Sequence, residues 1–282
     1  MAKKLLFHFL LVWGCLAIGA PRVVDGMSIA FLGDSITRLG FDQETGFINL
    51  VSSGLEANGI KIRVIPAGIS AHHSGHMRQR IENDVLRHQP QLLVLSCGLN
   101  DVWLEHRNQG VTLEVFSENV RAMVQMAEQA GVGVLLMTPT MIFEEPDNSW
   151  NLKLIPYISF LKDFAKEKNL VLVDQNHEFQ TERKRLKQLY PHALGNLLTT
   201  DGVHMSPIGD AVMARAILRA LGLNADEIAL AEKSWQDKFY LADRIIIPFK
   251  YFPKMIQEAD RRRSGVFNVI DAIIADYFEA LD

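Results

Sequence analysis

A serine follows the first strand-like segment of the chain, in the run FLGDSIT at residues 31–37. Residues 27–32 (MSIAFL) have the apolar composition of a short buried strand, and Gly33, Asp34 and Ser35 stand where that strand ends. In an open α/β sheet, ligands bind at the edge formed by the carboxyl ends of the strands. Ser35 is therefore placed like a catalytic nucleophile.

A serine hydroxyl is a weak nucleophile, so this interpretation requires a general base and an acid that orients it. Asp201 and His204 lie three residues apart, on an expected tight loop just before a helix. That spacing lets the carboxylate bond to Nδ1 of the imidazole while Nε2 faces Ser35. We predict a Ser-His-Asp arrangement in which His204 acts first as a base and then as an acid.

Two further blocks complete a recognisable set. Gly68 lies in the run AGIS, and Asn100 lies in the run GLND. Together with Ser35 and His204, these residues supply the letters of the SGNH/GDSL hydrolase family. The chain resembles that family over residues 27–222, and the resemblance leaves both ends of the chain uncovered.

The resemblance implies an oxyanion hole made of the backbone N–H groups of Ser35 and Gly68 and the side-chain amide of Asn100. A glycine, which has no Cβ, lets a backbone donor approach a substrate closely. The Asn100 amide is neutral and adds no competing acid or base. The family chemistry requires no cofactor and no metal, so we expect neither.

The second block departs from the family pattern. Pro66 stands where asparagine is common, Ala71 stands where a second glycine is common, and the run HHSGH follows. Three histidines so close together raise the possibility of a metal site, but no nearby cysteine or carboxylate completes a ligand set. We instead expect one of His72, His73 and His76 to line the substrate cleft.

Strand-like and helix-like segments alternate along residues 27–222. The expected strands span 27–32, 61–65, 92–97, 132–137 and 170–173. The expected helices span 45–58, 112–131, 150–168 and 206–222, and a further helix is expected to contain residues 77–85. Residues 41–43 are expected to form a loop. This alternation predicts an α/β fold, a three-layer α/β/α sandwich around a five-stranded parallel sheet. The family resemblance adds the flavodoxin-like strand order 2-1-3-4-5.

Residues 223–282 differ in character, because they are rich in charged and aromatic residues. We expect helices at 226–244 and 266–281, and no strand except 245–247, which Pro248 cuts short. The segment is predicted to be a helical C-terminal extension. Two roles remain open for it, a covering or dimerising appendage and a substrate-facing flap, and the oligomeric state is left open with them.

The composition limits the classes of function. With 282 residues, of which 48% are hydrophobic, the chain can bury one substantial core. Its formal net charge of −4 argues against nucleic acid as a partner. The short basic cluster at residues 261–263 is interpreted as a solvated helix face.

Residues 1–20 have the pattern of a secretory signal peptide, with Lys3 and Lys4 before an apolar run that ends at Ala20. Removal of this leader leaves no membrane span, and the predicted location is secreted or periplasmic. An uncleaved anchor and lipid attachment at Cys15 remain as alternatives. Cleavage leaves Cys97 as the single thiol, and its apolar surroundings favour a small buried hydrophobe over a nucleophile.

These observations predict a secreted serine esterase that acts on a small-molecule or polysaccharide ester. The exported context, the acidic balance and the segments around Asn100 and Pro139 are most similar to family members that deacetylate carbohydrate. The alternatives are a lipid esterase of lysophospholipase type and a non-catalytic glycan-binding module on the same fold. Intact Ser35, Asp201 and His204 argue against the binding module.

Overall fold

A computed structural model describes residues 22–242 and 245–279. Its centre is a parallel sheet in the order β2-β1-β3-β4-β5, which confirms the predicted fold and strand order. The strands are β1 (Ser28–Gly33), β2 (Arg63–Gly68), β3 (Leu92–Ser96), β4 (Gly133–Met137) and β5 (Val171–Val173). Strand β1 is buried along its whole length, as a central strand covered on both faces must be.

Strand β2 begins and ends later than the predicted 61–65, because it pairs with β1 from Arg63 to Gly68. The pairing continues through Pro66, which lies opposite Phe31. Proline is tolerated there because β2 is the edge strand. Among the described residues, no strand lies on its outer side, so the missing proline N–H breaks no hydrogen bond to a second neighbouring strand. Gly33 and Gly68 therefore end level with one another at the same edge of the sheet.

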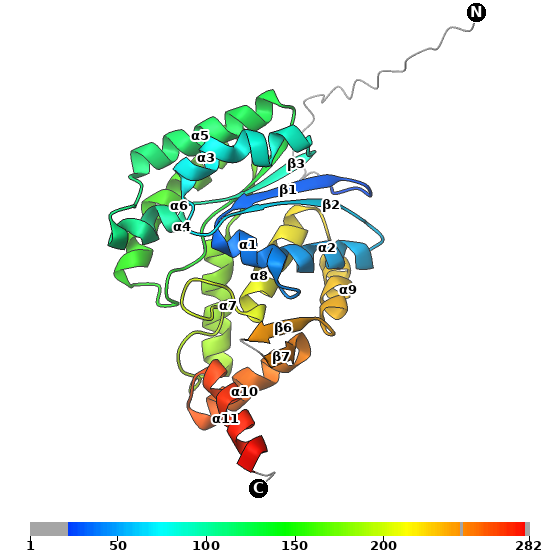
Figure 1. The fold of residues 1–282 in the computed structure, drawn as a ribbon, viewed down its shortest axis with the longest axis vertical. Coiled ribbons are helices and arrows are strands. Elements are labelled where there is room, and N and C mark those ends of the chain that lie inside the picture. Colours follow the sequence, from blue (N-terminus) through cyan, green and yellow to red (C-terminus); the bar gives the residue numbers. More distant parts are fainter. Residues whose placement is uncertain (1–21, 243–244, 280–282) are drawn as a thin grey trace, which may run out of the picture.

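Helices cover both faces of the sheet and complete the three layers (Figure 1). One layer contains α3 (Ser74–Asp84), α5 (Leu113–Gln129) and α6 (Ser149–Lys168). The other contains α1 (Ser35–Asp42), α2 (Phe47–Ala57) and α8 (Pro207–Ala220). The side chains of Thr112 and Ser206, residue types that favour N-caps, cap α5 and α8. Pro156 lies inside α6.

Short elements connect these layers at several points. They are η1 (Leu86–His88), α4 (Leu99–Trp103) and η2 (Leu104–Arg107). The loop predicted at 41–43 was wrong in part, because α1 extends from Ser35 to Asp42. The Asp34 side chain accepts the N–H of Ile36 at 2.9 Å, and this cap starts α1. The helix has no regular apolar stripe, so the sequence pattern did not predict it.

Helix α7 (Gln175–Leu189) was not predicted either. Its sequence is dominated by charged and amide side chains, and only Gln175, Phe179 and Leu186 are buried. An N-cap at Asp174 starts the helix, and packing against α8 supports it. A helix with so narrow a buried face carries little periodic signal.

The C-terminal extension is mixed rather than purely helical. It contains α9 (Ala225–Trp235), β6 (Phe239–Ala242), β7 (Ile245–Pro248), η3 (Phe249–Tyr251), α10 (Phe252–Arg262) and α11 (Val266–Glu279). The helix predicted at 226–244 was therefore too long, because residues 239–242 pair with 245–248 in an antiparallel hairpin. Residue 244 and the predicted helix end at 281 lie outside the described residues.

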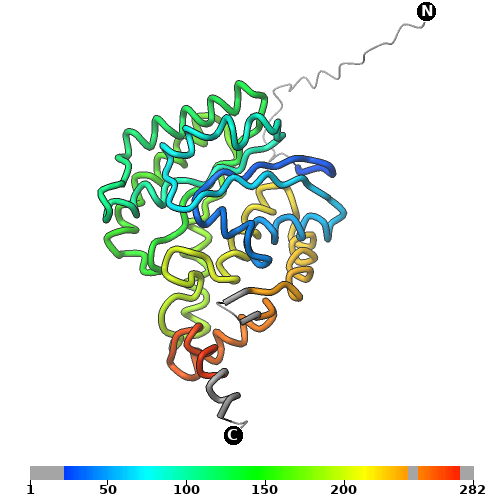
Figure 2. The backbone as a smooth tube through the Cα atoms, in the orientation of Figure 1, coloured from blue at the N-terminus to red at the C-terminus, as the bar shows by residue number. Residues whose placement is uncertain are grey.

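The extension continues the layer formed by α2 and α8. Helix α9 packs against α2, while α10 and α11 lie at the end of the molecule opposite the sheet (Figures 1 and 2). Within residues 22–242 and 245–279, no helix combines the length and apolarity that a bilayer span requires. The expected leader, residues 1–20 with Cys15, lies outside the described residues.

Candidate active site

Ser35 is the first residue of α1 and directly follows β1 at the carboxyl edge of the sheet. Its neighbour Asp34 is buried and holds the first turn of α1 through the N–H of Ile36. Burial raises the pKa of Asp34 to about 6, although the hydrogen bond from Ile36 opposes that rise. Asp34 thus acts as a structural cap that sets the position of Ser35.

The structure brings Ser35, His204 and Asp201 into one hydrogen-bonded series. His204 Nε2 lies 2.9 Å from Ser35 Oγ, and His204 Nδ1 lies 2.7 Å from Asp201 Oδ2. The other oxygen of Asp201 accepts the backbone N–H groups of Val203 and His204 at 2.9 and 2.8 Å. This is the arrangement in which an aspartate orients an imidazole toward a serine hydroxyl.

The electrostatics of this series agree with its geometry. Burial by itself raises the pKa of Asp201, but hydrogen bonds from the His204 ring and from backbone N–H groups outweigh it and lower that pKa to about 2. The hydrogen bond from Asp201 raises the pKa of His204 above 6.5, against the opposing effect of burial. A carboxylate that remains ionised next to the ring stabilises the imidazolium form.

Gly202 shapes the turn between Asp201 and His204. Its φ is +92°, a conformation that residues with a Cβ rarely adopt. A Cβ at this position would also lie 2.2 Å from Cδ1 of Phe143, whose backbone N–H donates to Gly202 O at 2.7 Å. The turn that carries the aspartate and the histidine therefore fits beneath a ring from the loop after β4.

Gly68 and Asn100, the other two residues of the predicted oxyanion hole, lie at the same carboxyl edge of the sheet as Ser35. Gly68 ends β2 opposite Gly33, and Asn100 lies in the first turn of α4. A Cβ at Gly68 would lie 2.3 Å from the backbone nitrogen of Arg38, so close contact with α1 is a further reason for glycine. The Asn100 amide is 5% exposed and donates one N–H to His72 O at 3.1 Å, which leaves its second N–H available.

The three histidines after Gly68 lie against one another. The ring centroids of His73 and His76 are 3.8 Å apart, and those of His72 and His76 are 4.7 Å apart. Burial lowers the pKa of both His72 and His73, and the charge of Arg80 lowers that of His72 further. In the described part of the chain, no group of three histidine, cysteine, aspartate or glutamate side chains is arranged to hold a metal ion.

With this geometry in place, the chain can be compared with known proteins. Residues 31–212 match the model of the GDSL-like Lipase/Acylhydrolase family. That segment covers more than half of the chain and contains each of the candidate site residues. The chain belongs to this family. It is therefore a serine ester hydrolase, which places it with the enzymes rather than with glycan-binding modules.

Relatives of this GDSL hydrolase include an acetylxylan esterase of Geobacillus stearothermophilus, 30% identical over 218 residues, which are 71% of this chain and 96% of that enzyme. The crystal structure of Axe2, an acetylxylan esterase from the same species, matches at a TM-score of 0.63 with 29% identity, over 72% of this chain and 97% of Axe2. The acetyl xylan esterase AlAXEase matches at a TM-score of 0.64 with 29% identity, over 69% of this chain and 99% of AlAXEase.

Solved structures of Axe2 also include catalytic mutants. They replace a serine, an aspartate and a histidine, and the histidine follows the aspartate by three residues. In this GDSL hydrolase, Ser35, Asp201 and His204 have the same residue types, the same order and the same Asp-to-His spacing. The likeness concerns Axe2, and it identifies these three residues as the candidates to test here.

One residue that organises the site of this GDSL hydrolase has no local sequence signal that predicts it. Glu144, in the loop after β4, is 3% exposed. Its Oε2 accepts the N–H of Leu197 at 2.8 Å, and its Oε1 accepts the N–H groups of Leu198 and Thr199, both at 2.7 Å. The hydroxyl of Thr199 also donates to Oε1 at 2.8 Å. Glu144 thus holds the strand-like segment that leads into Asp201.

A second buried carboxylate supports the Asn100 side of the site. Asp101 accepts the backbone N–H groups of Ser74 and Gly98, at 3.1 and 3.2 Å, and the Ser74 hydroxyl. Burial raises the pKa of Asp101 to about 6, while the hydrogen bonds from Ser74 oppose the rise. Asp101 therefore ties the start of α3 to the start of α4, which is a structural role.

Cys97 is buried at the end of β3, as expected. Burial raises the pKa of its thiol well above the ordinary value, and the nearby Asp101 and Asp34 carboxylates add to that rise. The thiol is therefore protonated at neutral pH and is a poor nucleophile. Ser35 therefore stays the candidate nucleophile.

Proposed function

We propose that this chain is an exported carbohydrate esterase that removes acetyl groups through an acyl-enzyme on Ser35. The observation that carries the proposal is the hydrogen-bonded series from Asp201 through His204 to Ser35 at the edge of the sheet. The match to an acetylxylan esterase over 96% of that enzyme's length supports acetylated carbohydrate as the substrate.

The first half of the reaction forms the acyl-enzyme. Ser35 Oγ attacks the ester carbonyl carbon while His204 Nε2, 2.9 Å away, takes the hydroxyl proton. Negative charge develops on the carbonyl oxygen, where the N–H groups of Ser35, Gly68 and Asn100 are proposed to donate. The tetrahedral intermediate then collapses, and the imidazolium gives its proton to the departing sugar oxygen.

The second half releases the acid. A water molecule attacks the acyl carbon, and His204 takes a proton from that water. Collapse of the second tetrahedral intermediate breaks the bond to Ser35 Oγ, which recovers its proton from His204. The Asp201 carboxylate stays ionised throughout, because its hydrogen bonds keep its pKa at about 2.

Acetate release is the test of this proposal. The purified protein would be incubated with acetylated xylan, acetylated xylo-oligosaccharides, p-nitrophenyl acetate and p-nitrophenyl laurate. We expect acetate from the carbohydrate substrates, hydrolysis of p-nitrophenyl acetate and little hydrolysis of the laurate ester. Strong laurate hydrolysis without acetate release from carbohydrate would contradict the proposal and favour the lipid esterase.

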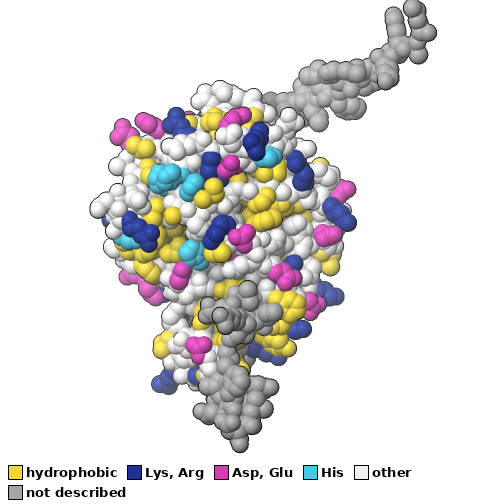
Figure 3. All heavy atoms as spheres, viewed as in Figure 1, with side chains coloured by type: hydrophobic (Ala, Val, Ile, Leu, Met, Phe, Trp, Pro, Cys, Tyr) yellow, Lys and Arg dark blue, Asp and Glu magenta, His cyan; other side chains and the backbone are white. Residues whose placement is uncertain are grey.

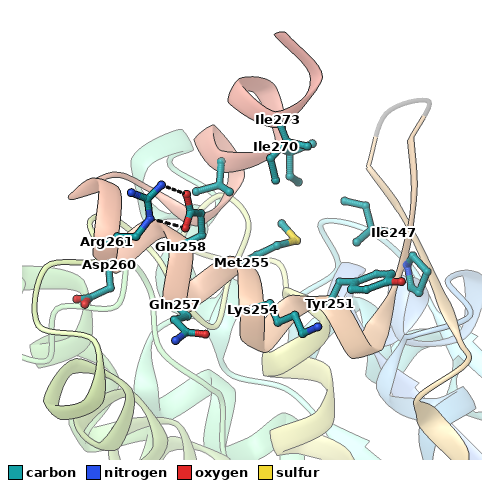
Figure 4. Close-up of a pocket in the computed structure, with 12 residues that line it drawn as sticks. Ile247, Tyr251, Lys254, Met255, Gln257, Glu258, Asp260, Arg261, Ile270 and Ile273 are labelled. Atoms are coloured by element: carbon teal, nitrogen blue, oxygen red, sulfur yellow. Dashed lines mark hydrogen bonds and ion pairs between the residues drawn. The ribbon is translucent and has the colours of Figure 1, made fainter. Parts of the chain in front are cut away.

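An apolar cavity in the extension bears on the lipid esterase. A cavity of about 990 Å³ lies between β7, η3, α10 and α11, with Met255, Ile270 and Ile273 among its apolar lining (Figure 4). None of the described residues that line this cavity belongs to the Ser35 site. An acyl chain bound there would not present its own ester to Ser35, so we rank a short acyl group first.

Export is part of the proposal as well. We propose that residues 1–20 direct secretion and are removed, that residues 27–222 form the hydrolase domain, and that residues 223–282 form its extension. Expression in a bacterial host, fractionation and N-terminal sequencing of the recovered protein would test the leader. A mature protein that begins near residue 20 and lies outside the cytoplasm is expected, whereas an intact N-terminus in the membrane fraction would indicate an anchor.

A further inference from the structure

Four aromatic side chains form a cluster, which we call the aromatic platform: Trp103, His106, Phe143 and Trp150. His106 and Phe143 are exposed, whereas Trp103 and Trp150 are half-buried and pack against the core. The Trp103 ring is central, with centroid distances of 4.6 Å to His106, 5.3 Å to Phe143 and 5.1 Å to Trp150. The contacts with Phe143 and Trp150 are edge to face. Such a cluster is held together by its own rings, which fixes their positions before any ligand binds.

The aromatic platform lies next to the candidate active site. Trp103 ends α4, the short helix that holds Asn100 in its first turn. Phe143, another member of the platform, lies over Gly202, which follows Asp201 in the turn that leads to His204. The platform therefore borders two of the elements that build the site. Figure 3 shows histidine side chains and a group of hydrophobic side chains together on the face that α3 and α4 occupy.

The backbone at Phe143 is strained. Its φ is +45°, a conformation that is unfavourable for a bulky residue. Two side-chain amides hold the backbone there. The amides of Asn148 and Asn151 donate to Phe143 O, at 3.0 and 3.2 Å. Both amides also donate to the carbonyls of Ile142 and Glu145. Strain maintained in this way is found most often at active sites and ligand clamps.

The strain holds an aromatic ring at the surface instead of in the core. The Phe143 side chain is 39% exposed, although burial of such a ring is favourable by about 1.5–3 kcal/mol. The ring is thus accessible to a ligand beside the half-buried faces of Trp103 and Trp150. Lys153 pairs with Glu105, and its Nζ lies 5.1 Å from the centre of the Trp150 ring. Arg107 Nε donates to His106 Nε2 at 3.0 Å. These cations lie at one side of the platform and leave the Phe143 ring without a cation contact among the described residues. The surface suits a neutral ligand with apolar faces.

We propose that the aromatic platform binds sugar rings of the substrate chain beside the residue whose acetyl group reaches Ser35. A pyranose ring presents C–H groups on its faces, and these pack against the negative face of an aromatic ring. The inference rests on the proposed function and extends it, because it assigns recognition of the carbohydrate chain to residues that take no part in the acyl transfer.

Binding of an unacetylated probe tests the platform without any ester chemistry. Xylohexaose would be titrated into wild-type protein, Trp150→Ala and Trp150→Phe, with isothermal calorimetry as the readout. We expect saturable binding to wild type, about tenfold weaker binding to Trp150→Ala, equivalent to about 1.4 kcal/mol, and partial recovery in Trp150→Phe. Equal affinity for wild type and Trp150→Ala overturns the inference.

Leu152→Ala is the matched control, because Leu152 is an exposed apolar residue on the same helix outside the platform. It is expected to bind xylohexaose as wild type does. If Trp150→Ala does not fold, as judged by circular dichroism, His106→Ala replaces it, since that ring is exposed at the edge of the platform. His106→Ala is expected to weaken binding in the same direction, and wild-type affinity would overturn the inference.

Kinetics separate failure of this inference from failure of the proposed function. The measured quantity is kcat/KM for acetylated xylo-oligosaccharides divided by kcat/KM for p-nitrophenyl acetate. The ratio is expected to fall about tenfold in Trp150→Ala and to stay at the wild-type value in Leu152→Ala. An unchanged ratio in Trp150→Ala overturns the inference that the platform binds sugar rings. A selective loss of p-nitrophenyl laurate hydrolysis in that variant also overturns it, because it would indicate a surface for an acyl chain. A wild-type protein that binds xylohexaose through Trp150 but releases no acetate overturns the proposed function alone.

Discussion

At the scale of single residues, Asp201 controls both the orientation and the basicity of His204. One of its oxygens bonds to the ring at 2.7 Å, and the other accepts two backbone N–H groups of its own turn. Because the carboxylate stays ionised, it raises the pKa of His204 above 6.5. In the proposed mechanism neutral His204 accepts a proton from Ser35, so activity is expected above that pKa and is expected to be lost as the pH falls through it.

Replacement of the nucleophile is the first prediction at this scale. Ser35→Ala is expected to lower kcat for p-nitrophenyl acetate by roughly 10⁴-fold or more, because no acyl-enzyme can form. The melting temperature is expected to stay close to that of wild type. Wild-type protein, and a control with the exposed Ser159→Ala change, should react with a fluorophosphonate probe, and Ser35→Ala should not. Residual turnover near the wild-type rate in Ser35→Ala would rule out this mechanism.

The pH dependence gives the second prediction. Asp201→Asn removes the carboxylate that raises the pKa of His204, so the acid limb of the kcat/KM profile is expected to move to lower pH. The rate should fall as well, by roughly 10³- to 10⁴-fold, because the amide no longer holds the required tautomer. The exposed Asp147→Asn variant serves as the control and should keep the wild-type profile. An acid limb that does not move in Asp201→Asn would show that this carboxylate does not set the basicity of His204.

At the scale of elements, the loop after β4 supports the turn that carries Asp201 and His204. The buried Glu144 carboxylate accepts three backbone N–H groups from residues 197–199 and the Thr199 hydroxyl. The Ser206 hydroxyl donates to Leu197 O at 3.0 Å, which ties the start of α8 to the same segment. These contacts hold the turn in place before a substrate arrives, which avoids reorganisation during the reaction.

Glu144→Gln tests this support and is the third prediction. The amide NH₂ would face a backbone N–H that now donates to the carboxylate, and an unsatisfied buried group costs about 1–3 kcal/mol. We expect kcat to fall about tenfold or more with a smaller change in KM, since the turn loosens while the substrate surface remains. Glu145→Gln is the matched control, because the neighbouring Glu145 is exposed and pairs with Arg183 at the surface. Equal kcat values for Glu144→Gln and wild type would refute this positioning role.

At the scale of the whole molecule, the extension is built into the helical layer beside α2. Trp235, at the end of α9, is 1% exposed, and its indole N–H donates to Leu50 O at 3.0 Å. Gly54 makes room for this contact, because a Cβ there would lie 2.8 Å from Cβ of Ala231. The extension therefore shares its core with the sheet domain instead of forming a separate unit around its own core.

Loss of the Trp235 anchor is the fourth prediction. Trp235→Ala is expected to lower the free energy of unfolding by about 3–5 kcal/mol, because it leaves a cavity and removes the indole hydrogen bond to Leu50 O. Leu230→Ala, an exposed change on the same helix, should alter it by no more than about 0.5 kcal/mol. Urea denaturation measures both. A similar, small effect in the two variants would mean that α9 contributes little to the stability of the fold.

Local patterns were sufficient to predict the sheet, because buried strands and helix caps such as Thr112 and Ser206 are signalled by neighbouring residues. The three candidates for the acyl transfer could be chosen in the same way, since each stands in a short motif at the end of a strand or before a helix. Pattern reasoning missed α7, whose buried face is too narrow to give a period, and β6, whose residues were assigned to the helix predicted at 226–244. The strand allowed at 245–247 is confirmed as part of β7, and β6 pairs with it.

Tertiary structure alone decided how the site is supported. Glu144 meets residues 197–199 across more than fifty positions of the chain, so no spacing in the sequence could reveal that contact. The strained backbone of Phe143 depends on the amides of Asn148 and Asn151 and on the space above Gly202. Residue type and local spacing identify groups that can react, whereas the contacts that hold them in position arise only when distant segments pack together.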